Sequence, residues 1–104
     1  MSEILTVSAK LCAALCVVLR EAREEASLSL GEVAKISGLN RQAITFIERG
    51  DRKPTTDTIA KLTLALGILP SQAWAKAEQR LKLELPQPIA RSGRNQSFPS
   101  KRKP

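Results

Sequence analysis

The sequence predicts an all-α fold, a bundle of five helices followed by a disordered basic tail. Apolar residues recur at spacings of three and four, as expected for helices that each bury one face. Only 3% of the residues are aromatic, so the core must be aliphatic and rich in alanine. With 104 residues the chain suffices for one small domain with a single core.

We expect a flexible N-terminus over residues 1–7 and a first helix over residues 8–25. The apolar stripe of this helix consists of Leu11, Leu15, Val18, Leu19 and Ala22. A second helix over residues 30–36 begins with the capping-box pattern of Ser29 and Glu32 and ends at Gly38. A third helix over residues 41–49 has Asn40 as its N-cap.

Two further helices complete the predicted domain, which extends over residues 8–85. Thr55 can cap a fourth helix over residues 56–66, and Gly67 ends it. Pro70 can open a fifth helix over residues 71–83. Residues 86–104 contain prolines among Ser, Asn, Gln, Gly and Arg and no acidic residue, which predicts a disordered basic tail.

The net charge of +7 and the pI near 10 favour a polyanionic partner. Five of the basic residues lie in the tail, however, so the charge alone says little about the folded part. The tail could add non-specific phosphate contacts, bind a partner protein or aid solubility.

Several function classes are excluded by what the sequence lacks. There is no histidine, and Cys12 and Cys16 alone do not complete a usual zinc site, so we expect buried free thiols and no metal. No apolar run approaches the roughly 20 residues of a membrane span, and no basic region opens a secretory signal. We therefore expect a cytoplasmic protein that is not an enzyme and has no cofactor, no membrane partner and no evident small-molecule ligand.

The second and third helices have the proportions of a helix-turn-helix motif. Ala34 is small where the helices cross, Gly38 can take a positive φ in the turn, and Ile44 and Ile47 anchor the second helix of the pair. Together with the segments "IERG" and "KPTTDTIAKLTLALGI", this spacing resembles the lambda-repressor-like, Cro/repressor or XRE-type family of helix-turn-helix regulators. The resemblance extends over about residues 15–83.

The resemblance implies a five-helix bundle whose third helix enters the major groove of double-stranded DNA. It also implies an ion pair between Arg23 and Glu48, joining the first helix to the third. The family commonly begins the second helix with a glutamine that contacts DNA, whereas this chain has Leu30. That contact is therefore not expected here.

Helical periodicity predicts which side chains of the third helix face outward. At roughly 100° per residue, Ile44 and Ile47 define the inner face, and the outward set is Arg41, Gln42, Thr45, Phe46 and Arg49. We expect base contacts from Arg41, Gln42, Thr45 and Phe46. We expect phosphate contacts from Ser29, Asn40, Arg49, Arg52 and Lys53. Phe46 has an open alternative, since its ring could instead pack on the first or fourth helix.

The favoured function is a sequence-specific transcriptional regulator, a repressor that binds a palindromic operator as a homodimer. The dimer surface that we expect consists of Leu69, Trp74, Ala77 and Leu81, although Trp74 and Leu81 could equally close the core of the monomer. The alternative function is a protein-interaction module of the same fold that binds nucleic acid only non-specifically.

Overall fold

The structure is a computed structural model that describes residues 2–83. Within this range the chain forms five helices and no strand, as the sequence predicts. The helices are α1 (Ser2–Glu25), α2 (Leu30–Ser37), α3 (Arg41–Glu48), α4 (Thr56–Ala65) and α5 (Pro70–Leu81). The expected tail, residues 86–104, lies outside the described residues.

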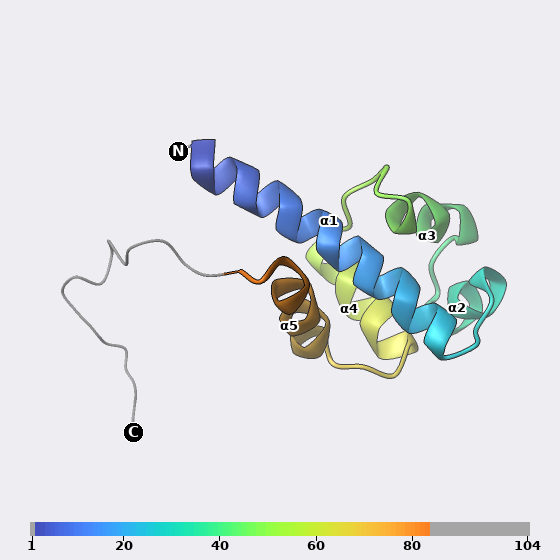
Figure 1. Ribbon diagram of the computed structural model, residues 1–104. Helices are drawn as coiled ribbons and strands as arrows, with labels where there is room; N and C mark the ends of the chain where they lie inside the picture. Colours follow the sequence, from blue (N-terminus) through green and yellow to red (C-terminus); the bar gives the residue numbers. More distant parts are fainter. Residues whose placement is uncertain (1, 84–104) are drawn as a thin grey trace, which may run out of the picture.

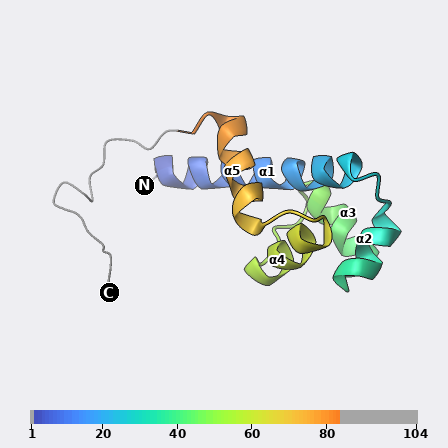
Figure 2. The ribbon, with the colours of Figure 1, turned by 90° about the horizontal axis from the view of Figure 1, so that it is seen from below.

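The long helix α1 organises the bundle. It packs against α5 and also contacts α3, whereas α2 packs on α3 and α4 (Figure 1). Seen from below, α5 crosses the middle of α1, and α2, α3 and α4 gather toward its C-terminal end (Figure 2). This arrangement places the pair α2–α3 at one end of the molecule, away from the N-terminus.

One apolar core joins all five helices. Its buried side chains include Leu15 and Leu19 from α1 and Leu62 from α4, each at most 2% exposed. The core also holds Val33 from α2, Ile44 and Ile47 from α3, and Ala73 and Ala77 from α5. Alanines on α5 allow its backbone to approach α1 closely, which is how a chain with so few aromatic residues closes its core.

The helix ends are defined by the caps that the sequence predicts. Thr55 Oγ1 accepts a hydrogen bond from the backbone N–H of Thr58 at the start of α4. At the start of α5, Pro70 occupies the first turn, and the Gln72 side-chain oxygen accepts from the N–H of Leu69 at 2.8 Å. Gly67 adopts a left-handed φ of 81° just after Leu66, the C-cap of α4.

The prediction for the N-terminus was wrong, because α1 begins at Ser2 and not near Ser8. Residues 2–7 include no proline or glycine, so nothing in them stops a helix from extending toward the N-terminus. Glu3 lies in the first turn, where a negative charge favours the helix dipole. Ile4 and Leu5 are each 68% exposed, so these turns extend past the core.

The fifth helix also corrects part of the expected dimer surface. Ala77 has no exposed surface because it packs in the core, so it cannot contact a second subunit. Trp74 and Leu81 are partly buried and pack against the same core. Of the four expected residues only Leu69, which is 56% exposed, stands free of the bundle.

The two cysteines are free thiols with different surroundings: Cys16 is buried in α1, and Cys12 is partly buried. Burial raises the pKa of the Cys16 thiol, and the nearby Cys12 thiol raises it further. A raised thiol pKa means that the folded state favours the protonated form. The stability that this contributes is present below the unfolded pKa and is lost as pH rises through the folded pKa.

Since the thiolate is the reactive species, Cys16 should resist alkylation in the native protein. Treatment with iodoacetamide near pH 8, about half a unit below the usual thiol pKa, followed by intact mass measurement, should show fast modification of Cys12 alone. The variant Cys12→Ser isolates the buried thiol and should be modified only when urea is added. Equal labelling rates of that variant with and without urea would contradict the burial of Cys16.

Other kinds of site find no support in residues 2–83. No helix in this range combines the length and the apolar character that crossing a bilayer requires. The same part of the chain contains no group of three or more Cys, Asp or Glu side chains placed to hold a metal ion.

Candidate nucleic-acid interface

Helices α2 and α3 form a helix-turn-helix pair around Gly38. This glycine has a φ of 78°, which an L side chain rarely adopts, and its N–H donates to the Ala34 carbonyl at 2.9 Å. Val33 and Ile44 are buried on the facing sides of the two helices. The turn therefore fixes the direction of α3 relative to α2, as the sequence predicts.

Asn40 begins α3 by satisfying two of its free backbone donors. Its Oδ1 atom accepts from the N–H groups of Gln42 at 2.7 Å and Ala43 at 3.3 Å. The side-chain oxygen of Asn40 is thus committed to the cap. Its amide nitrogen is the atom left to donate to a phosphate, so the expected phosphate contact of Asn40 stays a prediction.

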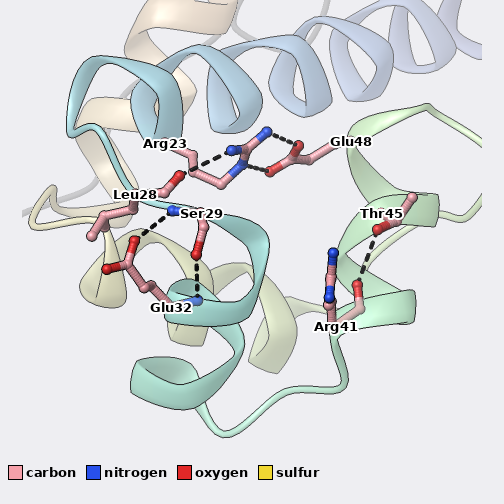
Figure 3. Close-up of polar contacts among 7 residues, drawn as sticks. All are labelled: Arg23, Leu28, Ser29, Glu32, Arg41, Thr45 and Glu48. Atoms are coloured by element: carbon pink, nitrogen blue, oxygen red, sulfur yellow. Dashed lines mark hydrogen bonds and ion pairs between the residues drawn. The ribbon is translucent and has the colours of Figure 1, made fainter.

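The outward face of α3 matches the predicted periodicity. Arg41, Gln42 and Arg49 are exposed, and Thr45 and Phe46 are partly buried. The Thr45 hydroxyl donates to the Arg41 carbonyl at 3.1 Å, within the same helix (Figure 3). Thr45 therefore presents its methyl group and its hydroxyl lone pairs to a partner, because its hydroxyl proton is already used.

The inward face of α3 carries its acidic residue. Glu48 is buried and forms a bidentate ion pair with Arg23 of α1, at 2.8 Å from Nε and 2.9 Å from the terminal nitrogen (Figure 3). The second terminal nitrogen of Arg23 donates to the Leu28 carbonyl at 3.0 Å. The hydrogen bonds to Glu48 raise the pKa of Arg23. This is the pair that the family resemblance implies, and it ties α1 to α3 and to the start of α2.

Ser29 caps α2 through the predicted capping box. Its hydroxyl accepts from the N–H of Glu32 at 3.0 Å, and the Glu32 carboxylate accepts from the N–H of Ser29 at 2.7 Å (Figure 3). The carboxylate of Glu32 places negative charge at this helix end. It competes with a DNA phosphate, so the structural role of Ser29 is the better supported one.

Leu30 has a structural role as well. It is partly buried and packs against the core. A glutamine at this position would need a hydrogen-bond partner for its side-chain amide. The departure from the family pattern thus adds apolar contact to the first turn of α2 and removes a candidate DNA contact.

The loop after α3 holds the remaining basic residues. Arg49 lies 3.3 Å from Asp51 in an exposed ion pair, and the guanidinium of Arg52 lies 5.2 Å from the centre of the Phe46 ring. Lys53 is exposed. Arg49, Arg52 and Lys53 are thus all at the surface beside the end of α3, and their phosphate contacts stay predictions.

Phe46 is partly buried, and within residues 2–83 it is absent from the apolar residues that pack against the core. Its ring lies beside Arg52. The alternative that Phe46 packs on the first or fourth helix stays a prediction. Sequence periodicity placed Phe46 outward but missed its contact with Arg52, which depends on the path of the loop. The only available signal in the sequence was the order Arg49-Gly50-Asp51-Arg52. A single aspartate lies between two arginines, so one arginine is left to find another partner.

Comparison with known proteins places this geometry in a family. The helix-turn-helix family model matches residues 19–72. Uncharacterized HTH-type transcriptional regulators of Mycobacterium bovis and Mycobacterium tuberculosis are 35% identical over 52 residues, or 50% of this chain. The chain spans only 20% of the length of these relatives.

Two groups of solved structures share the fold. The clp gene regulator ClgR of Corynebacterium glutamicum superposes with a TM-score of 0.65 and 26% identity, covering 71% of this chain and 96% of that one. The restriction-modification controller protein C.AhdI of Aeromonas hydrophila is 37% identical with a TM-score of 0.58, covering 62% and 97%. The family match covers half of the chain, including all of α2, α3 and α4. The chain therefore belongs to the XRE-type helix-turn-helix family of DNA-binding transcriptional regulators.

Proposed function

We propose that this protein is a sequence-specific repressor whose helix α3 enters the major groove of its operator. The observation that carries the proposal is the division of charge on α3. Its acidic residue, Glu48, is buried against Arg23, whereas Arg41 and Arg49 are exposed. The outward face of α3 thus carries no acidic side chain, and Asp51 of the following loop is paired with Arg49. A surface with excess positive charge suits the DNA backbone.

Base recognition is assigned to the N-terminal half of α3. Arg41 and Gln42 are exposed there, and their side chains have the donors and acceptors that guanine and adenine present in the major groove. The Thr45 methyl group suits a thymine methyl. Arg49 and Lys53 are assigned to phosphates on the flanking backbone, which fix the position of the domain without reading sequence.

Repression would follow from occupation of an operator that overlaps a promoter, and palindromic sites would be bound by two copies. With Ala77 excluded from the interface, the surface that supports such a dimer lies at the junction of α4 and α5. Leu64 and Leu69 are exposed there, at 61% and 56%.

The alternative, a protein-interaction module with only non-specific DNA binding, rested on Leu30 and Phe46. Leu30 packs against the core and Phe46 supports Arg52, so neither requires a protein partner. This alternative is nevertheless one outcome of the binding experiment below.

Selection of duplexes from a random DNA pool, followed by titration at two salt concentrations, tests the proposal. The selected duplex should bind on the order of a thousandfold more tightly than a scrambled one. In the variant Gln42→Ala this preference should fall about tenfold, because a bidentate base contact is lost. The matched control is Gln79→Ala, which removes an exposed glutamine from α5 and should change neither affinity. Equal affinity of the wild type for both duplexes would establish the non-specific alternative.

A further inference from the structure

The loop that follows α3 turns back over the end of that helix. Gly50 has a φ of 80° and donates its N–H to the Ile47 carbonyl at 3.0 Å. The N–H of Asp51 donates to the Phe46 carbonyl at 2.8 Å. These two bonds reverse the chain, so that the side chain of Arg52 lies above Phe46 in the last turn of α3.

The guanidinium of Arg52 lies over the ring of Phe46. The Arg52 guanidinium carbon lies 5.2 Å from the ring centre, within the range of cation–π attraction. Arg52 enters no ion pair within residues 2–83, because the neighbouring Asp51 is bound to Arg49. Within residues 2–83 no hydrogen bond or ion pair uses the N–H groups of Arg52, so they are available to an acceptor in the plane of the guanidinium.

The position of Arg52 relative to α3 indicates which acceptor its N–H groups would bind. Arg52 lies beyond the C-terminal end of α3, whereas base edges are reached from the N-terminal part of a recognition helix. A planar guanidinium matches two oxygens of one phosphate. An arginine on an exposed loop would lose rotamer freedom on binding, and the ring removes part of that cost by holding the side chain beforehand.

We propose that Phe46 is a positioning residue for Arg52, and that Arg52 so held binds one DNA phosphate at the wall of the groove. The inference rests on the proposed function, since it takes α3 to be the helix that meets DNA. It gives the aromatic residue on the outward face a role that is independent of base sequence.

The test compares Phe46→Leu, Phe46→Tyr, Arg52→Ala and the double variant Phe46→Leu/Arg52→Ala on a duplex of random sequence. Leucine keeps the apolar bulk and removes the ring, whereas tyrosine keeps the ring. Phe46→Leu should weaken binding about two- to fivefold, and Phe46→Tyr should bind as the wild type does. Arg52→Ala should make the slope of log affinity against log salt less negative by about 0.9, the value for one phosphate.

The double variant decides the coupling. If the ring acts through Arg52, Phe46→Leu should cause no further loss in the Arg52→Ala background. Independent, multiplying losses would overturn the proposal. It would also be overturned if Phe46→Leu weakened only the selected duplex and left the random one unchanged, because the ring would then read a base. Melting temperatures within about 2 °C of the wild type establish that every variant is folded.

Different results would refute the proposed function and the role of Phe46. Equal wild-type affinity for selected and random duplexes would refute sequence-specific regulation, yet the coupling of Phe46 to Arg52 on random DNA would still be measured. No detectable binding of the wild type to either duplex would overturn both.

Discussion

Replacing Glu48 with alanine should lower the free energy of unfolding by about 3 kcal/mol, since it leaves the charge of Arg23 without its partner at a largely buried site. The two side chains are 8% and 15% exposed, so water screens the pair weakly and cannot take over the role of the carboxylate. Arg23 would keep only its hydrogen bond to the Leu28 carbonyl. Urea denaturation monitored by circular dichroism measures this change in unfolding free energy.

A matched control lies elsewhere on α1. Glu21 pairs with Arg80 of α5 at 3.1 Å, with both side chains more than 40% exposed. Glu21→Ala should cost less than about 1 kcal/mol, since exposed pairs contribute little. If Glu48→Ala cost as little as Glu21→Ala, burial would not determine how much the Arg23–Glu48 pair contributes to the free energy of unfolding.

Two further results would define what the buried pair does. Replacing both partners by apolar residues, as in Arg23→Met with Glu48→Leu, should cost much less than Glu48→Ala alone, because no charge is left buried. The pKa of Arg23 is raised, so its stabilising effect is complete below the unfolded pKa and declines only as pH rises through the folded one. The contribution of Arg23 should therefore be constant at neutral pH.

Much of the fold could be predicted because its signals are local. The capping box of Ser29, the cap of Asn40 and the left-handed Gly38 each depend on residues within a few positions of one another, and all three form as expected. Ile44 and Ile47 lie on the inner face because helical periodicity fixes their direction.

The predictions that were wrong depended on which part of the molecule covers an apolar helix face. Periodicity correctly grouped Trp74, Ala77 and Leu81 on one side of α5, but it cannot say whether α1 or a second subunit covers that side. The structure places Ala77 entirely against the core. The start of α1 was misplaced for a related reason, since residues 2–7 carry few core contacts and their helical state depends on extension from the turns that follow.

The candidate interface shows the same limit. The outward direction of Phe46 follows from its own helix and could be predicted. Its contact with Arg52 depends on the left-handed Gly50 and on the hydrogen bond from Asp51 to the Phe46 carbonyl, which together set the path of the loop. Helical periodicity cannot predict a contact that depends on the path of such a turn.

The inner face of α3 should dominate stability, whereas its outer face is the proposed DNA-binding surface, and Ile44→Ala tests the first part. Ile44 has no exposed surface and lies in the core beside α2, so its truncation leaves a cavity and should cost about 3 kcal/mol of unfolding free energy. For a domain of this size that is a large share of the total stability. Thermal and urea denaturation measure it.

The matched substitution two residues earlier on α3 is Gln42→Ala, at an exposed position. Its unfolding free energy should stay within about 0.5 kcal/mol of the wild type while its DNA preference falls. Where Ile44→Ala is still folded, by contrast, it should retain the preference for the selected duplex, because the side chains that meet DNA are unchanged. If Ile44→Ala lost that preference while folded, the direction of α3 would depend on the packing of this one side chain. The helix-turn-helix frame would then be fixed by the core as much as by the Arg23–Glu48 pair.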